Sequence, residues 1–326
     1  MKTPVTFIIF KRPETTQKVF DVIRQAKPAK LFVVADGPRA DRDGEAEKCE
    51  ATRTIIEKVD WDCEVIKNYS DVNLGCAKRV SSGISWVFDN VEESIILEDD
   101  CIPHPSFFRF AEELLEKYKY DTRIASITAQ NAQLGRKRSN YSYYYSRYSH
   151  CWGWATWKRA WQSYDLHIKL WKEVKANNIL GDILHNSKAV GYWTKVFDSI
   201  YENPTGITWD YQWTFACWMQ GGLSIIPDVN LVSNVGVGAD STHFTSGENF
   251  SYINMPTQTM EFPLKHPPFI VRNSKADNFI QNTVYTNNQI QMMQQRFNKL
   301  RAYLKPHPTR NKHGECFNPK AFKVEK

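Results

Sequence analysis

Three consecutive carboxylates end an apolar stretch in the run Ser94-Ile95-Ile96-Leu97-Glu98-Asp99-Asp100. Three acids this close together repel one another unless a cation neutralises them. Divalent cations such as Mg²⁺ choose carboxylate oxygens and often share them with substrate phosphates. The run therefore predicts a site for a divalent cation and a phosphorylated substrate. The competing interpretation is a solvated acidic turn that stabilises the start of the helix expected at Pro105.

A further carboxylate, Asp36, follows the apolar segment Leu31–Ala35 and opens the turn sequence Asp-Gly-Pro. Ligands of parallel sheets bind beyond the carboxyl ends of the strands. Asp36 is therefore a candidate acceptor of a hydrogen bond from the base or ribose of a nucleotide. An ordinary turn aspartate is the alternative.

Basic and amide side chains occupy positions where they could contact a nucleotide. Arg12 follows the first apolar segment, and a guanidinium there can reach a base or a pyrophosphate. The alternative is a surface arginine ahead of Pro13. Asn73 and Arg79 flank the expected start of a helix, and helix N-termini favour phosphate. Of the adjacent pair, we prefer Arg79 to Lys78 for this contact.

Asp210 is the candidate catalytic base. A reaction in which a hydroxyl attacks needs a group that takes the proton of that hydroxyl. Asp210 is flanked by Trp209, Tyr211 and Trp213, which are suited to stacking on sugar rings. The alternative is an N-cap aspartate for the helix expected to run to Met219.

Tryptophans cluster in the second half of the chain. Trp152, Trp154 and Trp209 are candidates for stacking on the acceptor sugar, although we expect some of them to be core residues. A glycine-rich stretch ends at His243, and its glycines would let the stretch close over a bound ligand. One interpretation of His243 is an ordinary loop histidine.

Strands and helices that alternate along the first third of the chain must position these groups. Continuous short apolar runs predict buried strands, and apolar residues at helical spacing predict helices. Such alternation implies a mostly parallel sheet flanked by helices, the α/β class. The expected strands are Val5–Phe10, Leu31–Ala35, Cys63–Ile66, Ser94–Leu97 and Ile124–Thr128, and the expected helices are Thr15–Gln25, Glu45–Val59, Ala77–Phe88 and Pro105–Tyr120.

The pattern after residue 130 is irregular and rich in aromatic residues. We expect a helix over Trp209–Met219, a strand over Leu223–Ile226 and a loop over Asn234–His243. One domain would cover residues 1–285, with one half at 1–130 and the other at 131–285. Residues 286–326 would form a basic amphipathic helix and a tail.

Several motifs together resemble the GT-A glycosyltransferases, and N-acetylglucosaminyltransferase I with its bacterial relatives in particular. They are Asp36 at a strand end, Asn73-Leu74-Gly75 before a helix, Glu98-Asp99-Asp100 with Pro105-x-Phe107-Phe108, Cys151-Trp152-Gly153-Trp154, Trp157 to Trp161, and Trp209-Asp210. The likeness spans roughly Val5 to His243. Singly the motifs are weak, and together they are moderately specific.

The resemblance implies the GT-A fold, a nucleotide-sugar donor and inverting transfer of a sugar to a saccharide or a lipid-linked glycan. It implies that Asp100 binds the metal, Mn²⁺ or Mg²⁺, while Glu98 and Asp99 face the nucleotide ribose and the sugar of the donor. It also implies a nucleotide-sugar-binding half at 1–130 and an acceptor-binding half at 131–285. A ligand of the metal or of a phosphate is the second interpretation of His243, equal to the loop histidine. UDP and N-acetylglucosamine are the expected nucleotide and sugar, in the synthesis of a surface polysaccharide or glycan.

Charge and cysteine usage suggest where such an enzyme would work. The net charge is +6, and nine Lys or Arg against two Glu follow residue 290, so the basic excess lies in the tail. The expected helix Gln289–Leu304 could lie on an anionic membrane surface or dock on the domain. Nucleic acid is not an expected partner. Seven scattered cysteines and no long apolar segment favour a cytoplasmic protein.

Two other classes of protein remain as alternatives. A sugar-phosphate nucleotidyltransferase also uses a parallel sheet and metal-binding carboxylates, but it should carry a glycine-rich phosphate loop after the first strand. Here that position holds Lys11-Arg12-Pro13-Glu14. A non-catalytic carbohydrate-binding protein would use the tryptophans alone.

Overall fold

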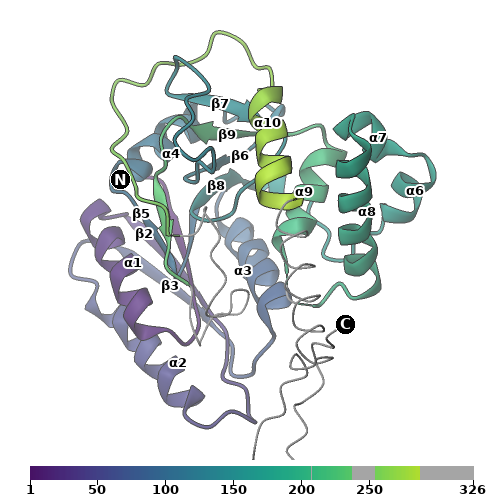
Figure 1. The fold of residues 1–326 in the computed structure, drawn as a ribbon. Helices are drawn as coiled ribbons and strands as arrows, with labels where there is room; N and C mark the ends of the chain where they lie inside the picture. The colour runs from purple at the N-terminus through teal and green to yellow at the C-terminus, as the bar shows by residue number, and fades with distance from the viewer. Residues whose placement is uncertain (207, 237–253, 287–326) are drawn as a thin grey trace, which may run out of the picture.

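The computed structural model describes residues 1–206, 208–236 and 254–286 (Figure 1). His243, most of the glycine-rich stretch and the expected helix Gln289–Leu304 lie outside the described residues. The first third of the chain alternates strand and helix as the sequence predicts. Its elements are β1 (Val5–Ile9), α1 (Pro13–Ala26), β2 (Lys30–Ala35), α2 (Glu45–Thr54), η1 (Ile55–Lys58), β3 (Glu64–Tyr69), α3 (Cys76–Asn90) and β4 (Glu93–Glu98).

The second part of the chain adds strands to the same sheet and a group of helices beside it. Its strands are β5 (Cys101–Pro103), β6 (Ile124–Thr128), β7 (Tyr143–Ser146), β8 (Trp154–Trp157), β9 (Leu223–Pro227) and β10 (Val232–Asn234). Its helices are α4 (Ser106–Lys117), α5 (Lys158–Trp161), α6 (Trp171–Ala176), α7 (Ile179–Leu184), α8 (Ser187–Glu202), α9 (Asp210–Met219), α10 (Ser274–Ile280) and η2 (Gln281–Thr286).

A central sheet of eight strands has the order β3-β2-β1-β4-β8-β6-β9-β7. Strands β3, β2, β1 and β4 run parallel to one another, whereas β8 is antiparallel to both β4 and β6. β6 and β9 are parallel, and β7 closes the edge as an antiparallel strand. Outside this sheet, β5 pairs with β10 as a short antiparallel ribbon. The predicted α/β class with a mostly parallel sheet and flanking helices is confirmed.

Side chains of the central strands alternate between two hydrophobic layers, one on each face of the sheet. In β1, Phe7 and Ile9 pack with α1 and α4, whereas Ile8 packs with α3 and α9. The same alternation separates Val33 from Val34 in β2. Figure 1 shows α1 and α2 together on one side of the sheet and α3 with α9 on the other. Burial on both faces explains why these strands read as continuous apolar runs.

A third hydrophobic cluster lies among the helices after α5. It joins α6, α7 and α8 to α9 and η2 through large aromatic side chains, Trp171, Trp193, Phe197, Phe215 and Trp218. This cluster explains the aromatic richness of residues 131–285, because the six-residue helices α6 and α7 need large side chains to build a core with α8 and α9. Among the described helices, none combines the length and apolarity that a bilayer crossing needs.

Element boundaries differ from the sequence prediction in two informative places. The helix expected over Glu45–Val59 ends at Thr54, and the chain continues as a tighter 3₁₀ turn, η1. That turn buries Ile55 and Ile56 against the core. Strands β7 and β8 were not predicted, because their aromatic residues are buried on both faces and show no alternation.

Candidate functional site

The carboxyl ends of β1, β2 and β4 meet at one edge of the sheet, because these three strands are parallel neighbours. Arg12 follows β1, Asp36 follows β2, and Glu98 ends β4 with Asp99 and Asp100 directly after it. The fold therefore gathers at one edge the side chains that the sequence singled out at strand ends. This is the edge at which parallel α/β sheets bind their ligands.

Arg12 lies across the last two acids of the run. Its Nη2 donates to Asp99 Oδ1 at 2.5 Å and its Nη1 donates to Asp100 Oδ2 at 2.8 Å. The second oxygen of Asp99 accepts the main-chain N–H of Phe10 at 3.1 Å. Burial would lower the pKa of Arg12, but the carboxylates of Asp99 and Asp100 outweigh it and raise that pKa above its ordinary value. Arg12 is therefore a cation that this site already contains.

Asp99 and Asp100 differ in their access to a ligand. Both oxygens of each carboxylate are hydrogen-bonded, but the Asp99 side chain is 3% exposed whereas the Asp100 side chain keeps 15% exposure. Burial raises the pKa of Asp99 despite the opposing charge of Arg12. The expected contact of Asp99 with the donor is not open in this conformation, because its side chain is almost fully buried against Arg12 and the Phe10 main chain.

Asp210 lies within electrostatic range of the acidic run. Burial raises the pKa of Glu98 well above its ordinary value, and the charges of Asp100, Asp99 and Asp210 add to the rise. Asp210 is half-buried and accepts a hydrogen bond from the Thr208 hydroxyl. The expectation that Asp210 could be an N-cap is wrong: Trp209 is the N-cap and Asp210 is the first residue of α9.

Asp36 organises the loop that opens α3. Its Oδ1 accepts the N–H groups of Gly37 at 3.0 Å and Leu74 at 2.9 Å, and its Oδ2 accepts that of Gly75 at 3.1 Å. The Asn73 amide donates to the Gly37 carbonyl at 2.8 Å. Burial raises the pKa of Asp36, and the three N–H groups oppose that rise. Asp36 is 5% exposed, so here it shapes the wall of the site.

The expected contact between Arg79 and a nucleotide is not supported by its position. Arg79 is 6% exposed, and its guanidinium donates to the Ala35 carbonyl at 3.1 Å and to Asn68 Oδ1 at 2.8 Å. It also donates to the Asn68 carbonyl. Arg79 therefore joins the ends of β2 and β3 from within the protein. Its neighbour Lys78 is the exposed member of the pair.

The three candidate tryptophans differ in burial. Trp154 has no exposed surface and stacks on Trp209, which is 3% exposed, with ring centroids 5.6 Å apart. Trp161 and Trp213 pack against the same group. Trp154 and Trp209 are thus core residues, so stacking on a sugar is not open to them in this conformation. Of the three candidates only Trp152 is half-buried.

Two residues that the sequence analysis did not assign to the site reach Asp100 from β10. The Asn234 amide faces the Asp100 carboxylate, and the main chain at Gly236 passes directly over it. The pairing of β10 with β5 brings them there. The sequence offers only a weak signal for this pairing, because both strands have three residues.

The donor set near Asp100 fits a cation that shares its ligands with a substrate. Within the described residues, no three His, Cys, Asp or Glu side chains come together in a way that would hold a metal ion by themselves. Of the two aspartates at the end of the run, Asp100 is the one that keeps solvent access, and Glu98 before them is half-buried. Mg²⁺ typically binds through one or two carboxylates and completes its shell with phosphates and water.

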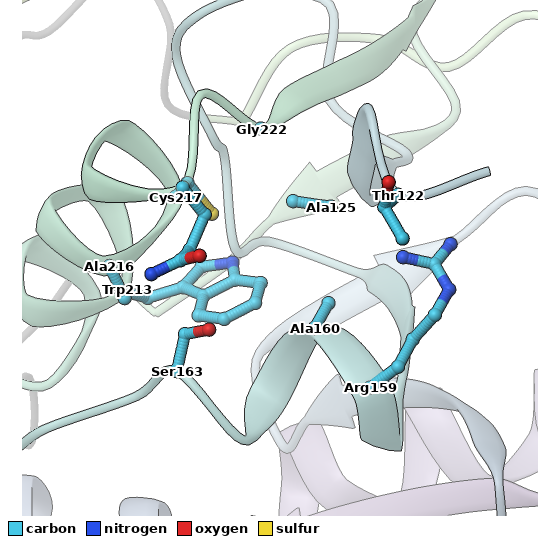
Figure 2. Close-up of a pocket in the computed structure, with 10 residues that line it drawn as sticks. Thr122, Ala125, Arg159, Ala160, Ser163, Trp213, Ala216, Cys217 and Gly222 are labelled. Atoms are coloured by element: carbon cyan, nitrogen blue, oxygen red, sulfur yellow. The ribbon is translucent and has the colours of Figure 1, made fainter.

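A cleft of about 250 Å³ lies elsewhere, at the other end of the strands (Figure 2). Thr122 and Ala125 line it at the start of β6, and Figure 2 shows Trp213 and Arg159 on opposite sides of it. All three guanidinium nitrogens of Arg159 donate to main-chain carbonyls near the end of α4 and the start of β6. The cleft is therefore separate from the acidic site.

Comparisons with known proteins give remote similarities. No model of a known protein family matches the sequence, and no curated protein matches it. Among solved structures, UDP-glucose pyrophosphorylase complexed with UDP-glucose is similar with a TM-score of 0.27 and 16% identity, over 45% of this chain and 62% of that chain. This chain thus covers less than two thirds of that protein.

Two further solved structures show the same level of similarity. The galactosyltransferase LgtC in complex with donor and acceptor sugar analogues has a TM-score of 0.32 and 8% identity, over 68% of this chain and 72% of that chain. The 4-diphosphocytidyl-2C-methyl-D-erythritol synthase of Anaerococcus prevotii has a TM-score of 0.29 and 11% identity, over 57% and 85%. At such values the reaction has to be argued from the residues themselves.

Proposed function

We propose that the chain is a GT-A glycosyltransferase that moves a sugar from a nucleotide-diphosphate donor to a saccharide acceptor with inversion. The observation that carries this proposal is that Asp210 lies within electrostatic range of Glu98, at the end of β4. A half-buried carboxylate next to a strand-end site for a phosphorylated ligand is what a base in sugar transfer requires. UDP and N-acetylglucosamine are the proposed nucleotide and sugar.

The residues divide between donor and acceptor. Asp100 would hold a divalent cation, which when bound stabilises the negative charge of a departing diphosphate. The loop that Asp36 organises would form the wall against the nucleotide, and Glu98 would contact the transferred sugar. Asp210 would take the proton of the acceptor hydroxyl as its oxygen attacks the anomeric carbon from the face opposite the leaving group. Attack from that face inverts the configuration.

The short loop between β1 and α1 favours a glycosyltransferase over a nucleotidyltransferase that would synthesise the nucleotide sugar. β1 ends at Ile9 and α1 begins at Pro13, so only Phe10, Lys11 and Arg12 separate the strand from the helix. A nucleotidyltransferase would be expected to place a glycine-rich phosphate loop here. A carbohydrate-binding protein without activity would not need Asp210 near a second carboxylate.

The proposal is tested by exchanging Asp210 for Asn in the full chain. UDP release from UDP-N-acetylglucosamine is measured with Mn²⁺ and a panel of saccharide acceptors, and UDP binding is measured by calorimetry. We expect D210N to lower kcat by about 10²- to 10⁴-fold, since general-base catalysis contributes that much, while the affinity for UDP is unchanged. Asp182→Asn is the matched control, because Asp182 is an exposed acid in the first turn of α7.

Three results would contradict the proposal. A D210N variant with normal turnover would remove Asp210 as the base. Pyrophosphate release from UTP and N-acetylglucosamine 1-phosphate would establish a nucleotidyltransferase instead. Saccharide binding with no turnover of any nucleotide sugar would indicate a binding protein.

Two proposals about the wider context accompany this activity. We propose that the enzyme acts in the cytoplasm on a surface polysaccharide or lipid-linked glycan. We also propose that it contacts the membrane through the basic segment 286–326. Sedimentation with anionic vesicles, compared between the full chain and one that ends at residue 286, measures that contact.

A further inference from the structure

The ribbon formed by β5 and β10 brings a buried amide onto the Asp100 carboxylate. Asn234 is opposite Cys101 in the register of the two strands, and its Nδ2 lies 3.4 Å from Asp100 Oδ1. We propose that Asn234 is a positioning residue that fixes the Asp100 carboxylate for a divalent cation, and that Gly236 keeps the space this requires. The inference rests on the proposed function and names how its cation site is held.

The orientation of the Asn234 side chain is set by its second contact. Its Oδ1 accepts the main-chain N–H of Gly236 at 3.0 Å, so the Nδ2 donors must face the other way. There they meet Asp100 Oδ1 at 3.4 Å and the Cys101 sulfur at 3.6 Å. Asn234 is 4% exposed. An amide this well buried and satisfied at both ends has little freedom to turn.

Gly236 shows how closely the main chain approaches the carboxylate. A Cβ at this position would lie 2.0 Å from Asp100 Oδ2 and 3.0 Å from Arg12 Nη1. The N–H of the preceding residue, Val235, donates to the Asp100 carbonyl at 2.9 Å. A side chain at residue 236 would therefore push the carboxylate away from its position.

Asp100 is thus held from three directions. Arg12 binds Oδ2, Asn234 and the Cys101 thiol bind Oδ1, and Val235 binds the main chain. Groups that orient a metal ligand without touching the metal strongly affect the affinity for the metal. Their removal typically weakens metal binding by about 10- to 100-fold. A single protein carboxylate has to be well oriented, because it has no second protein ligand to compensate for a poor position.

The test compares Asn234→Ala and Gly236→Ala with wild type in the full chain. Binding of Mn²⁺ is followed by electron paramagnetic resonance with UDP present, and binding of UDP is measured without metal. We expect both variants to weaken Mn²⁺ binding by about 10- to 100-fold and to leave metal-free UDP binding unchanged. In turnover, the Mn²⁺ concentration for half-maximal rate should rise more than kcat falls.

Ser233→Ala is the matched control. Ser233 lies on the same short strand, but its side chain is half-buried and donates to Asn254 Oδ1 at 3.1 Å. This variant should bind Mn²⁺ as wild type does. Urea unfolding of all variants separates a loss of stability from a loss of affinity.

Two outcomes would overturn the inference, and they are distinguishable. Wild-type Mn²⁺ affinity in both N234A and G236A, with wild type itself binding the metal, would remove Asn234 and Gly236 as positioning residues and leave the proposed function intact. A wild-type protein that binds no Mn²⁺ in the presence of UDP would overturn the cation site, and this inference with it.

Discussion

His150 links the stability of the chain to pH. It lies between β7 and β8, next to Ser149, whose hydroxyl is hydrogen-bonded to that of Thr214 in α9 at 2.9 Å. His150 is 9% exposed, and burial lowers its pKa from 6.5 to about 4. The cause is loss of hydration, which disfavours the charged imidazolium. The His150 imidazole is therefore protonated at a lower pH in the folded protein than in the unfolded chain.

The size of the effect follows from the two pKa values. Between pH 6.5 and about 4 the unfolded state binds a proton that the folded state does not, so the free energy of unfolding falls as the pH falls. One unit of pKa corresponds to about 1.4 kcal/mol, which gives a loss of about 3 kcal/mol across this interval. The contribution is fully present above pH 6.5, and no further loss occurs below about pH 4.

Urea unfolding of wild type and His150→Gln, followed by tryptophan fluorescence from pH 7.5 to pH 4, isolates this contribution. The free energy of unfolding of wild type should fall by about 3 kcal/mol more than that of H150Q. His167→Gln is the control, because His167 is exposed and its variant should run parallel to wild type. Parallel curves for wild type and H150Q would refute the reasoning.

Two further predictions concern packing and capping. Gly83→Ala should destabilise the protein by about 1–3 kcal/mol, because the added Cβ would lie 2.4 Å from Val34 Cγ1 between α3 and β2. Gly191 lies in open space on α8, so Gly191→Ala should instead stabilise the protein by about 0.5–1 kcal/mol. Equal changes in the free energy of unfolding by urea for the two variants would contradict the close packing at Gly83. Arg159→Gln should cost at least about 2 kcal/mol by thermal or urea unfolding, because it leaves three main-chain carbonyls without their charged donor. An unchanged R159Q would show that solvent replaces those bonds.

Local sequence patterns predicted most of the first third of the chain. Runs such as Val5–Ile9 are apolar throughout because both faces of the strand are buried. This pattern can be recognised without knowing which strands lie next to it in the sheet. The helix α9 was placed at Asp210 from its flanking residues, and the structure begins it there. The break of the expected helix at Thr54 was missed, because its charged surface residues continue past the point where Ile55 turns into the core.

The roles of buried polar residues could not be predicted in the same way. The sequence favoured Arg79 over Lys78 for a nucleotide contact, but the packing of α3 on β2 turns Arg79 inward to Ala35 and Asn68. Trp154 and Trp152 are indistinguishable by type. Strand β8 directs Trp154 into the core, where it meets Trp161, Trp209 and Trp213.

The sequence by itself determined that an apolar strand ends in Glu98-Asp99-Asp100, and that other polar groups follow neighbouring strands. Those features depend on residues close together in the chain, where periodicity and turn chemistry are sufficient. The tertiary structure decided which groups approach the run: Arg12 across Asp99 and Asp100, Asn234 on Asp100, and Asp210 within electrostatic range of Glu98. Each pairing joins segments about a hundred residues apart, because the packing of strands and helices, and not local pattern, sets such contacts.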